Sequence, residues 1–290
     1  MIEENDMRNM RKYAVLSVNF AVLLFGLAGL FAKWIHLPAI GITFGRVLFS
    51  SAALGTYNLF RKQSFRIAGR KDLFFLVCAG MILALHWWSF LESIQLSTVA
   101  VGTITFSSFP LFVTFLEPLI LRQRLRRRNV ILAVIILIGV LITVPEFSFE
   151  NHMFRGILVG MISALAYAVL TIMNKRFAEK YSSTLTAFYE QATAAVVLLP
   201  FVVSAQIRPS FHDLTLLVLL GVITTALAHS LFIDSLKTIS AQLAGICSSM
   251  ETVYGILFAM LLLGEIPSVR EIAGAAVIVG AVIIAQMQTE

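Results

Sequence analysis

The stretch LRQRLRRR at residues 121–128 aligns with LLGEIPSV at residues 262–269 when residues 72–143 are laid without a gap on residues 213–284. Both stretches follow a long apolar segment, but the first is strongly basic and the second carries an acid and no base. Basic residues collect on the cytoplasmic side of membrane proteins. The same corner of two related halves therefore faces opposite sides, which predicts an inverted internal repeat.

Matching residues continue along both halves. The alignment pairs Gly80 with Gly221 and the serines at 107–108 with those at 248–249, and a shift of one further residue pairs Lys33 with Lys175. Identity is low, so chance matching of apolar residues is the alternative explanation. The shared order of segments and the tight connection between the third and fourth favour duplication. The first repeat is predicted over residues 1–150 and the second over residues 151–290.

Composition restricts the class of protein. Of the 290 residues, 59% are apolar and 13% are charged, whereas soluble domains carry about a quarter charged residues. This composition excludes a soluble globule. Lys and Arg lie in short runs between apolar segments, which explains the positive charge without a nucleic-acid partner. Cys78 and Cys247 lie far apart within apolar stretches, as expected of inert thiols.

Ten apolar segments qualify as membrane helices, because crossing about 30 Å of hydrocarbon takes about 20 residues. They span residues 13–31, 38–60, 72–93, 97–121, 130–144, 154–173, 182–203, 214–235, 241–263 and 272–284. The sequence thus predicts an all-α polytopic membrane protein with two inverted halves of five helices each. The first segment is expected to remain as a helix, since acids precede it and no cleavage site follows it.

The basic residues also predict the orientation. With a cytoplasmic N-terminus, 17 of the 22 Lys and Arg residues fall in cytoplasmic segments, and the outer loops hold Lys33, Arg155, Arg208 and Arg270. The positive-inside rule therefore places both termini in the cytoplasm.

Several motifs resemble the EamA-type ten-helix exporters of the drug/metabolite transporter superfamily. They are Arg46 in the second segment, FPLF at residues 109–112, SMETVY at 249–254 and LLGE at 262–265. The resemblance covers essentially the whole chain and is strongest to bacterial aromatic amino-acid exporters. In two places the sequence departs from the family pattern, because Thr252 follows Glu251 where many members have proline, and Gln123 replaces an acid.

The resemblance implies a secondary transporter in the bacterial inner membrane. It implies export of amino acids and related small metabolites by alternating access, around a central cavity formed by the first, third, fourth, sixth, eighth and ninth helices. The expected partners are a small-molecule substrate, with aromatic amino acids included, and the lipid bilayer. The coupling ion and the oligomeric state stay open.

Charged side chains at membrane depth are costly and therefore mark candidate sites. Arg46 lies in the second segment and Glu190 at a compatible depth in the seventh, so these residues are interpreted as structural intramembrane charges that could pair. Contact between Arg46 and substrate stays open as the alternative. Glu251 lies mid-segment in a polar stripe with Ser248 and is a candidate cavity residue.

The other candidate substrate-binding residues are polar or aromatic residues at membrane depth. Such walls suit amphipathic solutes, although hydroxyls at helical spacing also serve helix packing. The complete predicted set is Asn19, His86, Trp87, Trp88, Ser107, Pro110, Tyr167, His229, Ser248 and Glu251. The neighbours Trp87 and Trp88 point about 100° apart on a helix, so one of them is expected to face the cavity and the other to pack or face lipid.

The sequence contains no catalytic or metal-binding motif. It has no Walker loop, no HExxH, no GxSxG and no CxxC. We therefore expect no enzymatic activity, no cofactor and no metal. A broader drug or nucleotide-sugar transporter is the main alternative, although a phosphate-bearing substrate requires several cations and Arg46 is the one clear intramembrane base. The second alternative is a membrane receptor or scaffold that transports nothing.

Overall fold

The computed structural model describes the chain except residues 1, 122–126, 145–147 and 288–290. The described residues form α-helices and one π-helical segment, η1, and include no strand. The helices are α1 (Ile2–Ala28), α2 (Phe31–Trp34), α3 (Ala39–Phe60), α4 (Arg70–Leu96), α5 (Val99–Phe106), α6 (Phe109–Leu121), α7 (Arg127–Thr143), α8 (His152–Ala178), α9 (Ser183–Ser204), α10 (Phe211–Gly221), η1 (Val222–Leu227), α11 (Ala228–Ser235), α12 (Ala241–Ser248), α13 (Met250–Leu263) and α14 (Val269–Met287).

Eight stretches of the described residues are long and apolar enough to cross a membrane, and a shorter apolar helix covers Val130–Thr143. The eight stretches correspond to the first four predicted segments and to the sixth through ninth. The fifth predicted segment lies within α7 except for its last residue, and the tenth lies within α14. The all-helical, multi-pass fold is thus confirmed, while the count of ten spans and the inverted symmetry stay predictions.

Two of these spans are interrupted at aligned serines. The fourth span breaks at Ser107 and Ser108, between α5 and α6, and the ninth breaks at Ser249, between α12 and α13. These serine hydroxyls donate to carbonyls three or four residues earlier, a bond that bends helices. Pro110 lacks the amide hydrogen that would continue the helix across the first break. The eighth span is interrupted differently, by η1 between α10 and α11.

Two aligned glycines let neighbouring spans approach closely. Gly80 on α4 faces α9, where an added Cβ would lie 2.6 Å from the Glu190 carbonyl oxygen. Gly221, at the end of α10, faces α3, where an added Cβ would lie 2.9 Å from the Arg46 carbonyl oxygen. A side chain at either position would collide with backbone, so glycine permits both crossings. Arg46 and Glu190 therefore lie at corresponding crossings of the bundle.

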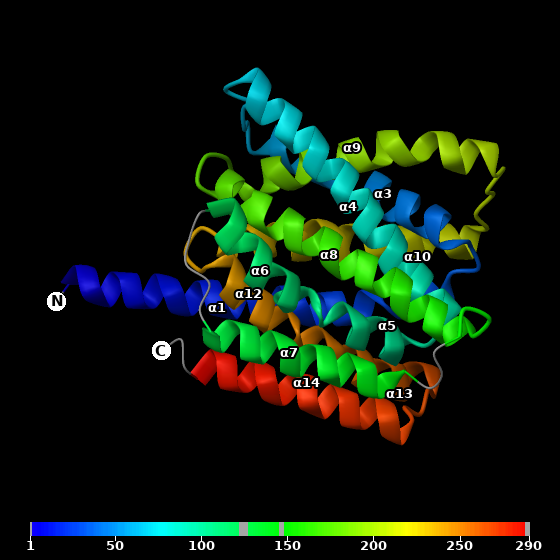
Figure 1. Cartoon of the computed structure of the whole chain (residues 1–290). Coiled ribbons are helices and arrows are strands. Elements are labelled where there is room, and N and C mark those ends of the chain that lie inside the picture. The colour runs from blue at the N-terminus through cyan, green and yellow to red at the C-terminus, as the bar shows by residue number, and fades with distance from the viewer. Residues whose placement is uncertain (1, 122–126, 145–147, 288–290) are drawn as a thin grey trace.

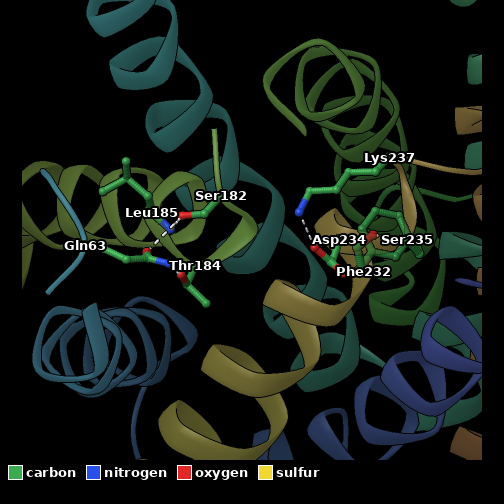
Figure 2. A network of polar contacts seen from close by, with 8 residues as sticks. All are labelled: Gln63, Ser182, Thr184, Leu185, Phe232, Asp234, Ser235 and Lys237. Atoms are coloured by element: carbon green, nitrogen blue, oxygen red, sulfur yellow. Dashed lines mark hydrogen bonds and ion pairs between the residues drawn. The ribbon is translucent and has the colours of Figure 1, made fainter. Parts of the chain in front are cut away.

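The chain termini lie at the same end of the bundle, and α7 lies alongside α14 (Figure 1). Polar contacts join loops of the two halves. At the start of α9, the hydroxyls of Ser182 and Thr184 donate to Gln63 Oε1 at 3.0 and 3.2 Å (Figure 2). Within the second half, Lys237 just after α11 donates to Asp234 near the end of that helix (Figure 2). Because Gln63 precedes residue 150 and Ser182 follows it, the first contact holds the two halves together.

Two lysines that align in the sequence hold tight turns at opposite ends of the bundle. Lys33 on α2 donates from Nζ to the Ser97 carbonyl at 2.9 Å, in the turn between α4 and α5. Lys175 on α8 donates to the carbonyls of Leu236 and Ile239 at 2.5 and 3.1 Å, between α11 and α12. One group of helices is α1 with α11 and α13, and the other is α8 with α4, α5 and α6. Lys33 lies just after α1 and contacts the turn after α4, whereas Lys175 lies on α8 and contacts the turn after α11. Each lysine therefore links the two groups.

Candidate functional site

A cavity of about 20 Å³ lies where α1, α3, α4, α5, α8 and α13 converge. Aromatic and apolar side chains share its wall with ionisable ones. The lining residues are Phe25, Ala28, Arg46, His86, Trp87, Phe90, Phe106, Tyr167 and Glu251. A space of this size holds about one water molecule. As it stands, this cavity therefore has no room for an organic solute.

Two opposite charges face this cavity. Arg46 is 1% exposed, donates from Nε to the Thr225 hydroxyl at 3.0 Å, and holds Cζ 4.0 Å from the Trp87 ring centroid. Glu251 lies in the first turn of α13, where the helix N-terminus favours a carboxylate. Within the described part of the chain, neither side chain forms an ion pair, and the Glu251 carboxylate accepts no hydrogen bond. The two charges attract each other at longer range.

A histidine and a tyrosine complete the polar side of the wall. His86 Nδ1 lies 2.8 Å from Ser163 Oγ and 3.2 Å from the Ser163 carbonyl oxygen, which orients the imidazole. The rings of His86 and Tyr167 lie 4.5 Å apart between centroids. The buried Tyr167 hydroxyl has no hydrogen-bond partner among the described residues. This hydroxyl is therefore free to bind a water molecule or a ligand in the cavity.

A second polar group lies next to this cavity. Glu190 Oε2 is 2.8 Å from His229 Nε2, and both side chains are fully buried. The rings of His229 and Trp87 lie 5.5 Å apart between centroids, with their planes steeply inclined at 66°. The suggested pairing of Arg46 with Glu190 is not formed, because Glu190 contacts His229 and Arg46 donates to Thr225 of η1. His229, predicted to line the cavity, is held in the pair with Glu190.

The remaining predicted residues lie outside the cavity wall. Asn19 donates to its own helix at the Val15 carbonyl, and Trp88 packs half-buried against the core, so Trp87 is the tryptophan that faces the cavity. Serine hydroxyls form hydrogen bonds at the two helix breaks. Ser107 bonds Thr252 Oγ1 across the bundle, and Ser248 donates to the Ala244 carbonyl of its own helix at 3.0 Å. Pro110 is buried in the first turn of α6.

Four apolar wall residues escaped prediction. They are Phe25, Ala28, Phe90 and Phe106. Their helical spacing carried a usable signal, because Phe25 and Ala28 are three residues apart and His86 and Phe90 are four apart, which places each pair on one helix face. Apolar residues are too common in this chain for that signal to stand out.

The described residues include one group of metal-ligand types, His36, His212 and Asp213, with ligand atoms within 4.8 Å of one another. The Asp213 carboxylate is already engaged at the start of α10. It accepts the Ser210 amide and hydroxyl at 3.0 and 2.6 Å and the His36 amide at 3.1 Å. The position of this aspartate is explained by helix capping, without a metal.

The arrangement defines a class of protein: a multi-pass helical membrane protein whose spans close around a cavity with aromatic walls and two opposite charges. The chain belongs to the EamA-like transporter family, whose model matches residues 12–144 and again residues 154–287. Membership confirms the family that the motifs resembled and makes the chain a membrane transporter. It also agrees with the expectation of a protein that is not an enzyme.

Several transporters are similar to this chain along most of its length. An S-adenosylmethionine uptake transporter of Rickettsia bellii is 24% identical over 246 residues, covering 85% of this chain and 83% of the relative. The pseudopaline exporter CntI of Pseudomonas aeruginosa is 26% identical over 251 residues, covering 85% and 86%. A crystal structure with a TM-score of 0.72 and 19% identity covers 95% of this chain and 96% of its own, and it supports the fold.

Proposed function

We propose that this protein is a secondary transporter that exports amino acids and related small metabolites across the cytoplasmic membrane of a bacterium. The observation that carries the proposal is the placement of Arg46 and Glu251, without ion-pair partners among the described residues, on one aromatic-lined cavity. An α-amino acid is a zwitterion, so its carboxylate suits the guanidinium and its ammonium group suits the carboxylate. Such a ligand offsets the cost of holding both charges at membrane depth.

Aromatic rings provide a surface for the substrate side chain. Trp87, Phe90, Phe106 and Tyr167 line the same cavity as the two charges. Flat rings favour apolar and aromatic side chains over small polar ones. This arrangement supports the larger amino acids as substrates, with His86 as an additional polar contact.

The names of the relatives agree in part with this substrate class. S-adenosylmethionine, named for the Rickettsia protein, carries an α-amino acid group. One relative is named for uptake and another for export, so the direction proposed here follows the motif resemblance to exporters.

We further propose that transport proceeds by alternating access between two inverted halves, residues 1–150 and 151–290. The aligned serine breaks, the aligned lysine contacts and the two matches to the family model support this division. Because the cavity of about 20 Å³ admits no organic solute, one end of the bundle must open before a substrate binds.

Labelling of single cysteines tests the proposed orientation. With both termini in the cytoplasm, an impermeant thiol reagent added outside intact cells should modify Ser268→Cys and spare Arg127→Cys. Cys78 and Cys247 are first replaced by alanine. The reverse labelling pattern would contradict the inverted arrangement.

Flux measurement tests the transport activity itself. Purified protein in proteoliposomes should exchange labelled phenylalanine and methionine across the membrane, and Glu251→Gln should abolish this exchange. Asn19→Ala is the matched control, because Asn19 bonds its own helix outside the cavity, and it should transport normally. Exchange of a nucleotide sugar in place of amino acids would favour the broader alternative, and exchange of neither would reject the proposal.

A further inference from the structure

Glu190 on α9 and His229 on α11 leave polar atoms without partners in the membrane interior. Their contact uses Glu190 Oε2 and His229 Nε2, which lie 2.8 Å apart. The second polar atom of each, Glu190 Oε1 and His229 Nδ1, has no hydrogen-bond partner among the described residues. The nitrogen and the oxygen of the neighbouring Gln191 side-chain amide also lack hydrogen-bond partners among these residues. Buried polar atoms are nearly always paired, so these atoms are available to bind a proton or a water molecule.

The number of protons on the pair sets its charge. With Nε2–H donating to the carboxylate and a bare Nδ1, the pair has a net charge of −1. One added proton, on the lone pair of Nδ1 or on Oε1, makes the pair neutral overall. A net charge away from water costs several kcal/mol, and the added proton removes that net charge. The proton leaves when water reaches the pair or when a nearby cation compensates the negative charge.

A nearby cation contacts the same indole ring as His229. Trp87 meets the His229 ring at 5.5 Å between centroids and carries Arg46 Cζ 4.0 Å from its own centroid. Arg46 and Trp87 both line the cavity. The geometry points to a proton-binding site formed by Glu190 and His229, coupled through Trp87 to the guanidinium that faces the transport cavity. The effect on transport rests on the proposed function, whereas proton binding does not.

Four other titratable groups face this region from the helices packed around it. They are Arg46 on α3, His86 on α4, Tyr167 on α8 and Glu251 on α13. Arg46, and His86 when it is charged, oppose the added proton, while the Glu251 carboxylate favours it. A substrate carboxylate bound at Arg46 neutralises that cation and thereby favours proton binding at the pair. Substrate and proton should therefore bind cooperatively.

Fluorescence of Trp87 provides a direct test that needs no substrate. Trp34→Phe and Trp88→Phe leave Trp87 as the one tryptophan, and an imidazolium at its edge quenches indole emission. Titration of the purified protein between about pH 5 and 9 should show a single one-proton step. His229→Gln should abolish this step, and Glu190→Gln should shift it to a different pH. His86→Gln is the matched control, since its ring lies 6.4 Å from Trp87, and it should keep the step.

Infrared spectroscopy supplies a second readout if His229→Gln fails to fold. A titratable carboxyl or imidazole band that is present in the parent protein should disappear or move in Glu190→Gln. A fluorescence step that survives both pair variants, or one that disappears with His86→Gln, would overturn the assignment. In proteoliposomes, Glu190→Gln should keep substrate exchange but lose acceleration by a pH gradient. Failure of amino-acid exchange in the parent protein would reject the substrate class and leave the titration result standing.

Discussion

Arg46 and Glu190 lie at corresponding helix crossings, each beside an aligned glycine, yet their surroundings differ. Glu190 contacts His229, and both side chains are fully buried. Arg46 meets a hydroxyl and a ring, and its guanidinium faces a cavity that also contains Glu251. An ionised group that finds its partner within the protein contributes to folding, whereas one left facing a cavity is available to a ligand. The backbone frame is shared, and the side chains have taken on different roles.

The largest expected effect comes from removing Glu190 from its contact with His229. Glu190→Leu leaves His229 without a partner and should destabilise the protein by about 3–5 kcal/mol, as loss of one member of a buried pair does. The matched change Glu251→Leu removes a carboxylate that has no hydrogen-bond or ion-pair partner among the described residues, so it should preserve or raise stability. Thermal unfolding in detergent measures both variants. Equal destabilisation by the two changes would erase the distinction between the sites.

The next largest effect concerns Arg46, the cation that lines the cavity. Arg46→Ala should weaken amino-acid uptake roughly a hundredfold, because a two-fold charged hydrogen bond to the substrate carboxylate is worth about 3 kcal/mol. Arg46→Lys should restore part of this loss, since a point charge does not replace the planar fork. Uptake is measured in vesicles with matched amounts of protein, and exposed Arg155→Ala is the control. A fall in folded yield as large as the fall in uptake would instead return Arg46 to the structural role expected from the sequence.

A smaller effect should separate the two adjacent tryptophans. Trp87→Ala removes a wall of the cavity and should weaken phenylalanine transport by roughly 1–3 kcal/mol, with less effect on threonine. Trp88→Ala alters packing outside the wall and should leave this preference unchanged. Competition between the two amino acids for uptake gives the ratio directly. A changed ratio in Trp88→Ala alone would reverse the assignment of the two rings.

The smallest effect concerns the lysines at the two ends. Lys33→Met removes one charged hydrogen bond and Lys175→Met removes two, and each change should shift the balance between open and closed states by at least about 1 kcal/mol, or roughly fivefold. Ala28→Cys reports cavity access, because Ala28 lines the cavity. In Lys33→Met, a thiol reagent added at the end of the bundle away from the termini should label this cysteine faster. In Lys175→Met, the reagent should label it faster when added at the end that holds the termini. The same change from both lysine variants would show that the contacts are not specific to one end.

The sequence predicted the helices better than the site, for a physical reason. Apolar length fixes where a chain crosses a membrane, so eight spans were located from hydropathy alone. The aligned serines coincide with the breaks at Ser108 and Ser249 because hydroxyls act on their own helix. The partner of Glu190 lies 39 residues away on another helix, at a distance set by how helices cross. Hydropathy carries no information on that crossing, so the pair could not be predicted.

The lysine contacts at the two ends carry an energetic consequence for the transport cycle. If one end opens as the other closes, the contact of one lysine breaks while that of the other remains, and opening at the Lys175 end breaks one ammonium-to-carbonyl hydrogen bond more than opening at the Lys33 end. A difference of one such hydrogen bond is about 1 kcal/mol, so both open states stay accessible. Such a carrier is reversible, and the concentration gradients of its solute and coupling ion determine the direction of net flow.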